Sequence, residues 1–541
     1  MKKSFLMMVA LAAMAAAAEE TLVGGLFDFS AGRPGKTGTL VEMSNETSRR
    51  ISALFAKRID EIRRTPNLSV PAGAPCRYLS PSGCDDADGL TPQRAWRTIA
   101  RLNREKLARG TYVLFERGGL YRGSVTASPG VTYTAYGQGP KPCITSSPMN
   151  GADPAKWEKT DVKDVWRCQI GTDDVGTLVF NGGPLHAIKI VPVYNKDGSF
   201  TQQYGGRPFN KGYADLAEDL HFWHDYSAKT KFRPHAKGSG WLYLKSKENP
   251  GRRFSSIEFC VRRHGFALPH HEDVTIDNVS VMYVGSHGVG AGGGRNLTVK
   301  NCSFAWIGGS IQAEDLFRRN WPVRYGNAVE IWGRCDGYTI DNCHVRDVYD
   351  AALTHQYSQS DWTGSPPKFM KNVRYTRNVI ERCNYSIEYF LSGINNPASN
   401  PSRMENVLFE GNLMRDAAAG FCRQRPDIHQ GAHIKSWRYY GGAGNNRATG
   451  FVIRDNVLFG SRCLLIEISS GLLNEDGSDS MPEMTGNVII GERGQRFGVL
   501  NQGRAVEFAY DERLLENLGK RYSGNVFAVF PPRAAQTNDA R

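Results

Sequence analysis

A short apolar strand that ends in an asparagine turn recurs along this chain, and this repeat limits the possible folds more than any other feature. Each unit is too short to hold a strand–helix–strand crossover, and successive turns lie about 23 to 44 residues apart. Short strands broken by Asn and Gly are typical of coils stacked in a parallel solenoid. An Asn at the same turn of each coil would form a ladder with a spacing of about 4.8 Å. The six turn residues are Asn278, Asn301, Asn342, Asn378, Asn412 and Asn456.

The repeat predicts an all-β fold in which a parallel β-helix spans 76–506. A β-propeller is the alternative, but it needs hairpin-linked strands, and the sequence lacks hairpin turns. The segment 19–75 precedes the solenoid, and apolar residues spaced by three to four predict an amphipathic helix over 43–66. This helix would cap the open end of the solenoid, which otherwise exposes an edge. Aromatic and Gly-rich sequence predicts a small β-rich insertion at about 171–260, and 507–541 is expected to close the chain.

The first 18 residues have the pattern of a secretory signal peptide. Lys2 and Lys3 precede an apolar stretch, and small residues follow at the expected cleavage site. We therefore expect a secreted or periplasmic protein. No other apolar run approaches the roughly 18 residues of a membrane-spanning helix. The formal net charge of +13 favours acidic glycans or an anionic cell surface as partners over nucleic acid.

The chain has 11 cysteines, an odd number, so at least one thiol stays unpaired in a monomer. Export permits disulfides, and Cys76 with Cys84 and Cys143 with Cys168 are the candidate pairs. The other cysteines lie in strand-like runs, where thiols are expected to be buried as small apolar groups. No Cys or His spacing indicates a metal site, and we expect no cofactor.

Several motifs resemble a known group of exported right-handed parallel β-helix proteins that act on polysaccharides. They include YLSPSGCDDADGLTPQRAWRTI, GTYVLFERGGLYRGSV, RYGNAVEIWG, VRDVYDAALTHQ and VIERCNYSIEYF. The last three are most similar to the β-helix glycoside hydrolase family that includes α-L-fucosidases and xylanases. The resemblance covers most of 76–500. It implies a glycoside hydrolase whose substrate is a polysaccharide or oligosaccharide. We expect the protein to be a monomer.

Three acidic residues are the candidate catalytic groups: Glu330, Asp350 and Glu388. Strand alternation places Glu330, Leu353 and Glu388 outward on successive coils and Val329, Ala352 and Ile387 inward. The two glutamates would then lie two rungs apart, with roughly 9.6 Å between their backbones. Hydrolysis of a glycosidic bond needs two carboxyl groups, one as acid and one as base or nucleophile. Clustered acids raise one another's pKa, which keeps one of them protonated, but the sequence does not assign the individual roles.

The residues expected to bind the sugar surround these acids. They are Asp347, His355, Trp332, Asn327, Tyr389, His287 and Arg324. A second group on a loop-rich segment could bind an acidic or sulfated sugar: Arg423, Arg425, His429 and His433.

Three other interpretations stay open at this stage. An outward Glu is often only solvated, or paired with an arginine such as Arg382 or Arg423. A polysaccharide lyase of the same fold would use Lys371, Arg374 and Arg377 on an acidic glycan. A glycan-binding surface protein would use the same wall without any catalysis.

Overall fold

A computed structural model describes most of the chain between residues 40 and 530. The described residues are 40–171, 173–195, 199–203, 206–234, 236–314, 322–357, 369–391, 402–425, 431–436, 446–469, 481–501, 505–509, 522 and 524–530. The predicted signal peptide at 1–18 lies outside the described residues, as does most of the predicted closing segment at 507–541.

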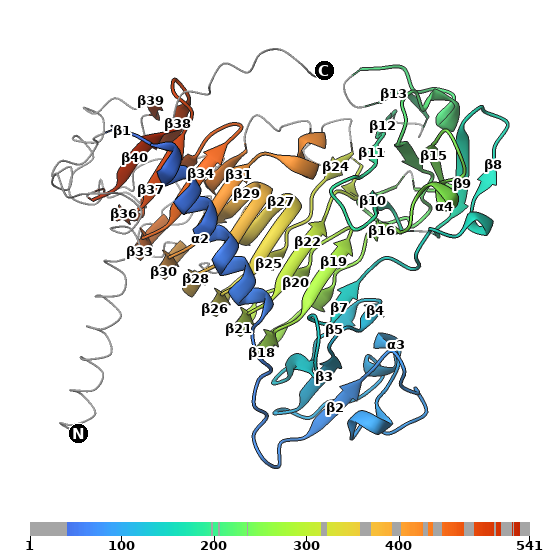
Figure 1. The fold of residues 1–541 in the computed structure, drawn as a ribbon, viewed down its shortest axis with the longest axis horizontal. Helices are drawn as coiled ribbons and strands as arrows, with labels where there is room; N and C mark the ends of the chain where they lie inside the picture. The colour runs from blue at the N-terminus through green and yellow to red at the C-terminus, as the bar shows by residue number, and fades with distance from the viewer. Residues whose placement is uncertain are drawn as a thin grey trace.

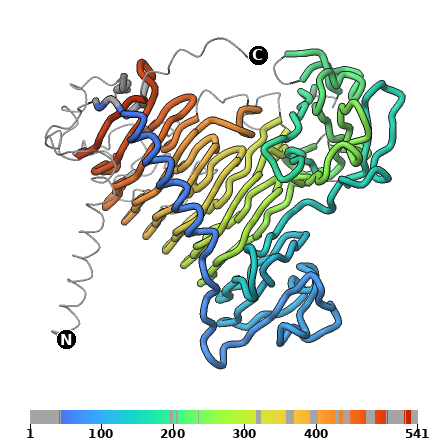
Figure 2. The backbone as a smooth tube through the Cα atoms, viewed as in Figure 1, coloured from blue at the N-terminus to red at the C-terminus, as the bar shows by residue number. Residues whose placement is uncertain are grey.

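The chain forms a right-handed parallel β-helix, as predicted, whose coils stack in chain order (Figures 1 and 2). One face, here face 1, is a ten-stranded sheet. Its strands are β2 (Cys76–Leu79), β3 (Tyr112–Glu116), β6 (Thr132–Tyr136), β18 (His271–Asp277), β21 (Gly294–Lys300), β26 (Cys335–Asp341), β28 (Phe369–Thr376), β30 (Ser402–Glu410), β33 (Asn446–Arg454) and β36 (Glu483–Thr485).

The other two faces belong to one 21-stranded sheet because two long strands bend from one face to the other. These strands are β27 (His344–Tyr357) and β29 (Val379–Leu391), which contribute to both faces. Face 2 also holds β4 (Leu120–Arg122), β7 (Cys143–Thr145), β19 (Ser280–Val284), β22 (Ser303–Ile307), β31 (Leu413–Ala417), β34 (Val457–Ser461), β37 (Val488–Gly491), β40 (Val526–Val529) and β1 (Leu40–Glu42). Face 3 holds β5 (Val125–Thr126), β17 (Phe266–Leu268), β20 (Val289–Ala291), β25 (Val329–Trp332), β32 (Ala432–Ser436), β35 (Ile466–Ser469), β38 (Arg496–Asn501) and the antiparallel β39 (Ala505–Ala509).

The predicted asparagine ladder exists at the turn before face 2. It runs through Asn378, Asn412, Asn456, Asn487 and Asn525, whose side chains are linked by hydrogen bonds of 2.8 to 2.9 Å. Each Oδ1 also accepts a main-chain N–H from the coil before it, so these buried amides satisfy backbone groups as well.

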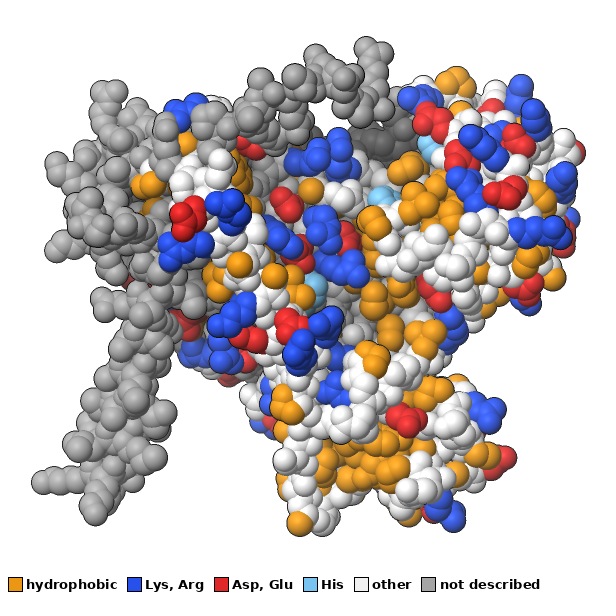
Figure 3. All heavy atoms as spheres, viewed as in Figure 1, with side chains coloured by type: hydrophobic (Ala, Val, Ile, Leu, Met, Phe, Trp, Pro, Cys, Tyr) orange, Lys and Arg blue, Asp and Glu red, His pale blue; other side chains and the backbone are white. Residues whose placement is uncertain are grey.

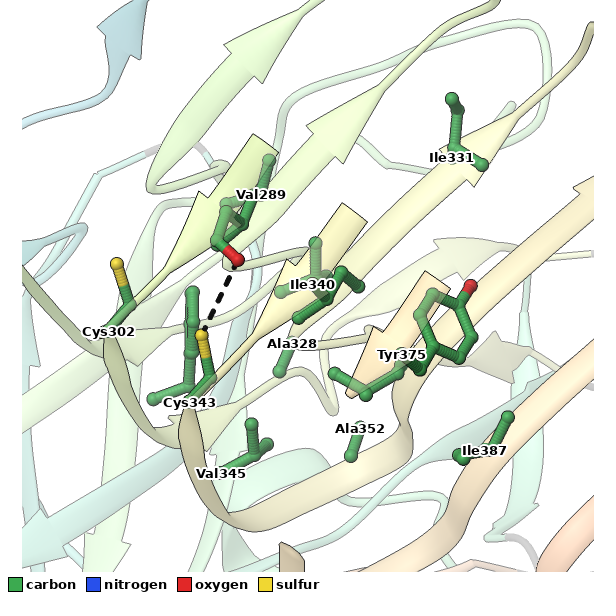
Figure 4. Packing of buried hydrophobic residues seen from close by; sticks show 14 of the residues in the cluster. Val289, Cys302, Ala328, Ile331, Ile340, Cys343, Val345, Ala352, Tyr375 and Ile387 are labelled. Carbon is green, nitrogen blue, oxygen red and sulfur yellow. Dashed lines mark hydrogen bonds between the residues drawn. The ribbon is translucent and has the colours of Figure 1, made fainter. Parts of the chain in front are cut away.

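The earlier turn asparagines are not part of this ladder. Asn278, Asn301 and Asn342 sit one position before it, with left-handed φ of 58°, 55° and 52°. The ladder position itself holds Cys302 and Cys343 on neighbouring coils, whose side chains lie among the interior apolar residues in Figure 4. The six asparagines are therefore not equivalent, and the prediction that aligned them was wrong by one residue for the first three.

The predicted amphipathic helix is α2 (Asn45–Arg63), and the Ser44 hydroxyl caps its first turn. Its buried Ile51, Phe55 and Ile62 join an apolar cluster formed by face-2 residues from several coils. That cluster includes Val379, Leu413, Val457, Val488 and Val526. The helix therefore runs along the flank of the stack and crosses the coils, rather than across the open end as expected (Figure 1).

The β-rich insertion is present and begins before residue 171. It contains a five-stranded sheet of β11 (Ile188–Lys189), β14 (His221–His224), β15 (Trp241–Lys245), β9 (Val165–Gln169) and β8 (Glu158–Lys159), and the pair β12 (Pro192–Tyr194) and β13 (Phe200–Gln203). The strand β10 (Val175–Phe180) joins it to the solenoid by antiparallel pairing with β16 (Ile257–Val261). The buried Asp174 carboxylate fixes this junction through Lys189 Nζ at 2.5 Å and the Ile311 N–H at 2.6 Å.

The remaining described elements are short. They are α3 (Ile99–Leu102), α4 (Pro250–Arg253), the 3₁₀ helices η1 (Pro92–Arg94), η2 (Pro154–Lys156), η3 (Gly212–Asp215) and η4 (Gly420–Gln424), and the antiparallel pair β23 (Ile311–Ala313) and β24 (Val323–Arg324).

All 11 cysteines are free thiols, and most of them are buried. The predicted bridges from Cys76 to Cys84 and from Cys143 to Cys168 are therefore wrong. Within the described ranges, no helix is long and apolar enough to cross a membrane. The same part of the chain shows no group of three or more His, Cys, Asp or Glu side chains arranged to hold a metal ion.

Candidate active site

The two candidate glutamates lie in one outward row on face 3. Glu330 of β25 pairs in register with Thr354 of β27, and Thr354 pairs with Glu388 of β29. The glutamates are thus two rungs apart, roughly 9.6 Å at the backbone.

The residue between the glutamates differs from the prediction, which placed Leu353 outward. Leu353 is fully buried in the interior, in register with Val329 and Ile387. The register of β27 against β29 shifts between Val348 and Ala351, where β27 bends between faces. A one-residue shift moves every later side chain of a strand to the opposite face. Alternation counted across this irregularity therefore gives the wrong inward and outward positions.

Asp350 lies at this bend, one coil after Glu330, and Asn327 bridges the two coils. Asn327 Oδ1 accepts the main-chain N–H of Ala351 at 2.8 Å, and its Nδ2 donates to Glu330 Oε2. The side chains of Glu330 and Asp350 are each 12% exposed, so both are largely shielded from water.

The Tyr325 hydroxyl lies within the electrostatic reach of both carboxyl groups. Burial, together with the charges of Glu330 and Asp350, raises the pKa of Tyr325 to about 12, against a lowering by Arg262. Neither Tyr325 nor Arg262 is among the residues predicted from the sequence, although Tyr325 lies within the motif RYGNAVEIWG.

Glu330 lies in an environment that favours its protonated form. Burial raises the pKa of Glu330 to about 7, against a smaller lowering by the Asn327 hydrogen bond. His287 Nδ1 lies 3.2 Å from Glu330 Oε2, and burial together with Arg262 lowers the pKa of His287 to about 3. The nearest ring is therefore neutral near pH 7 and supplies no positive charge to the carboxyl group.

Asp350 has a different partner. Arg425 Nη1 lies 2.7 Å from Asp350 Oδ1, and the arginine side chain is itself largely buried. A guanidinium in contact with a carboxylate stabilises its ionised form. The bend therefore combines a carboxyl group that favours its proton with one that is held as an anion.

Glu388 is the third acid of the predicted set. It is buried and accepts a hydrogen bond of 2.6 Å from Gln356 Nε2. The next residue in its row is Lys435, whose Nζ lies 2.5 Å from the Glu467 carboxylate. Glu388 is thus placed among polar groups farther along the wall from Glu330.

An aromatic pair borders the row of acids on face 3. Trp332 and Phe390 stand two residues after Glu330 and Glu388 and therefore point outward on the same wall. Their rings meet edge to face at 5.7 Å, and Trp332 is 43% exposed. An exposed indole at this place offers a flat apolar surface to the face of a sugar ring.

Two residues expected to bind sugar instead face the interior. His355 is fully buried, its Nδ1 lies 2.9 Å from the Tyr375 hydroxyl, and its ring stacks on Tyr389. Tyr389 packs in turn against Phe409 and Phe451. The prediction that His355 and Tyr389 line the site is therefore wrong, because both take the inward positions of their strands.

Two further residues expected to bind sugar have structural partners. Asp347 has a left-handed φ of 52° at the preceding corner, and its carboxylate pairs with Arg382 at 2.8 Å and Arg346 at 2.7 Å. The Arg324 guanidinium is buried, donates to the carbonyl oxygen of Gly309 at 2.5 Å and stacks over the Tyr349 ring. Of the seven predicted sugar-binding residues, the structure places Asn327, His287 and Trp332 beside the acids.

Among the described members of the loop-rich group, one residue contributes to the site. Arg425 reaches Asp350, whereas His433 is buried and contacts the Ser386 hydroxyl and the carbonyl oxygen of Gly460. His429 lies outside the described residues. Figure 3 shows basic and acidic side chains interspersed over the visible face, so the net positive charge is not gathered there in a single patch.

No family model matches the chain, and no curated protein matches it. Among solved structures, the chain is similar to a complex of XylC with xylose, at 10% identity and a TM-score of 0.41, over 84% of this chain and 82% of that one. A glycoside hydrolase matches at 12% identity and a TM-score of 0.40, over 85% and 97%. A polygalacturonase from Erwinia carotovora ssp. carotovora matches at 11% identity and a TM-score of 0.30, over 82% and 97%. At these values, function has to be inferred from the site itself.

Proposed function

We propose that the chain is an exported glycoside hydrolase that cleaves a polysaccharide or oligosaccharide on face 3 of its β-helix. The observation that carries this proposal is the difference between two neighbouring carboxyl groups. Glu330 favours its protonated form, and Asp350 is ionised beside Arg425. Carboxyl groups in opposite protonation states are the requirement for acid–base hydrolysis of a glycosidic bond.

In the proposed reaction Glu330 is the general acid. Its proton passes to the departing sugar oxygen as the bond from that oxygen to the anomeric carbon breaks. A water molecule completes the reaction by forming a bond to that carbon and giving up a proton. Asp350 is the first candidate to accept that proton or to attack the carbon itself, and Glu388 is the second. Trp332 would hold a neighbouring sugar ring.

The geometry favours hydrolysis over the lyase alternative. Of the cations suggested for a lyase, Lys371 and Arg374 lie on β28 of face 1 and Arg377 directly follows this strand, whereas Glu330 lies on face 3. Lys371 pairs with Glu405 at 2.9 Å, and Arg377 pairs with Asp341 at 2.5 Å. These cations are therefore engaged with acids on a different wall from the candidate site.

The test is digestion of a panel of neutral, uronic-acid and sulfated glycans, with detection of new reducing ends. We expect hydrolysis of at least one class by the unchanged chain. Single amide substitutions of the three acids should then separate their roles. Glu330→Gln should reduce turnover most, followed by the substitution of the second catalytic carboxylate, Asp350→Asn or Glu388→Gln.

Two results would contradict the proposal. One is full activity in Glu330→Gln, which would show that Glu330 is not the general acid. The other is a product that absorbs in the ultraviolet as an unsaturated uronide, because this product identifies elimination rather than hydrolysis.

A further inference from the structure

The hydrogen bonds around Glu330 define which groups can donate and which can only accept. The Asn327 main-chain N–H points to His287 Nδ1 at 3.1 Å. A backbone N–H is always a donor, so Nδ1 must be the acceptor, and the proton of the neutral ring is on Nε2. The same Nδ1 lies 3.2 Å from Glu330 Oε2.

The orientation of the Asn327 amide is fixed in the same way. The Ala351 main-chain N–H donates to Asn327 Oδ1, so the other end of that amide, Nδ2, is the group that donates to Glu330 Oε2. Oε2 also lies beside His287 Nδ1, whose single lone pair already accepts the Asn327 main-chain N–H. An ionised carboxylate would place two electron-rich acceptor atoms against each other there, and a protonated carboxyl avoids this contact.

We propose that His287 is a positioning residue that keeps the transferable proton on Glu330 by placing a neutral acceptor nitrogen beside its carboxyl group. The proposal rests on the proposed function, since it concerns how the general acid is kept ready. An electron-rich, uncharged neighbour in a shielded site disfavours the ionised form of a carboxyl group.

The other groups around this corner do not reverse that preference. His264 lies behind His287, with ring centres 5.1 Å apart, and its Nδ1 accepts the His287 main-chain N–H at 3.3 Å. Burial is the first cause that lowers the pKa of each ring to about 3, so both histidines are neutral at neutral pH. The titratable and charged groups facing the corner are His264, His287, Arg262, Tyr325, Tyr338 and Asp350.

The first experiment reads the histidine ring directly and needs no substrate. It records nitrogen NMR spectra of the full chain labelled with ¹⁵N at histidine, and assigns His287 by the signal lost in His287→Ala. We expect a neutral ring protonated on Nε2 from about pH 5 to 8, a range in which an unperturbed histidine changes its charge. A ring protonated on both nitrogens at pH 6, or on Nδ1 alone, would overturn the proposal.

The second experiment measures the pH profile of kcat/KM for hydrolysis. His287→Ala removes the acceptor and admits water, and both changes lower the pKa of Glu330, so the basic limb should fall by about one pH unit or more. His287→Asn restores an acceptor oxygen and should return the limb toward its original position. The matched control is His264→Ala, which removes a ring that does not touch Glu330 and should leave the limb within a few tenths of a unit.

A basic limb unmoved in His287→Ala would overturn the proposal. The two proposals also fail separately. If the ring has the expected proton but Glu330→Gln hydrolyses glycan normally, only the proposed function fails. If Glu330→Gln is inactive but His287 carries two protons, only the positioning role fails.

Discussion

Two largely shielded glutamates on the outer walls of this β-helix have opposite surroundings. Glu381, at the start of β29 on face 2, is 3% exposed and contacts Arg415 and His344, the latter at 2.7 Å. These partners lower the pKa of Glu381 to about 2, although burial alone would raise it. Glu330, on β25 of face 3, has a neutral ring as its neighbour, and burial raises its pKa to about 7.

The comparison shows that burial does not by itself make an acid catalytic. The Glu381 carboxylate is surrounded by hydrogen-bond donors and positive charge. It therefore stays ionised and links side chains on face 2. Glu330 is surrounded by an acceptor ring, a tyrosine and an amide, so its charge changes within the physiological range. The partners, rather than depth alone, decide which glutamate can transfer a proton.

The largest expected effect comes from the same amide substitution at both sites. Glu330→Gln should lower kcat/KM on a responsive glycan by about 10²–10⁴-fold, because the general acid is lost. Glu381→Gln should leave kcat/KM of the folded protein within about threefold. Equal losses of kcat/KM in the two variants would show that the two glutamates do not differ in function.

Stability should change in the opposite order. Glu381→Gln leaves Arg415 without its counter-charge and should lower the free energy of unfolding by about 3–5 kcal/mol. Glu330→Gln exchanges one neutral group for another at pH 6 and should change it by less than about 1 kcal/mol. Urea unfolding at pH 6 measures both variants.

A surface glutamate provides the control for the unfolding experiment. Glu405→Gln removes one partner of the part-exposed pair with Lys371 and should cost less than about 1 kcal/mol. A loss in Glu381→Gln no larger than in this control would show that the face-2 pair is not structural.

The pH dependence of stability should separate the two glutamates further. An unfolded glutamate has a pKa of about 4.3, so the raised pKa of Glu330 makes stability fall as pH rises from about 4 to 7. The lowered pKa of Glu381 makes stability fall as pH drops through about 4 toward 2. Each effect is at most about 4 kcal/mol.

Unfolding midpoints across this range should therefore lose only their near-neutral slope in Glu330→Gln and only their acid slope in Glu381→Gln. A near-neutral slope that persists unchanged in Glu330→Gln would assign that titration to another group.

The smallest effect concerns the aromatic border of face 3. Trp332→Ala should raise KM by up to about tenfold with little change in kcat, because a stacking surface worth about 1 kcal/mol is removed. Phe55→Ala, on the buried side of α2, is the contrasting aromatic substitution, and it should lower stability without raising KM. An unchanged KM in Trp332→Ala would place the sugar elsewhere.

Much of the fold could be predicted from the sequence because its signals are local. Short strands and turn asparagines predicted the parallel coils, and apolar spacing predicted α2. The exact place of each asparagine was not visible, because Asn in a left-handed turn and Asn in a buried ladder differ by a single position. Asn342 and Asn378 illustrate this, one with φ of 52° and the other within the ladder.

The site was predictable only in part. The row of Glu330 and Glu388 follows from alternation within single strands. The bend in β27 was not predictable by that rule, and it moved Leu353 and His355 into the interior. His287 comes from an earlier coil than Glu330, so no spacing along the chain marks it as the partner of this carboxyl group.

The most direct test of this account is the protonation state of Glu330 itself. Infrared difference spectra between the unchanged chain and Glu330→Gln, recorded across neutral pH, would follow its carboxyl stretch. We predict a protonated carboxyl band at pH 6 that disappears with a midpoint near 7. A difference spectrum that shows only carboxylate at pH 6 would contradict the assignment of Glu330 as the acid.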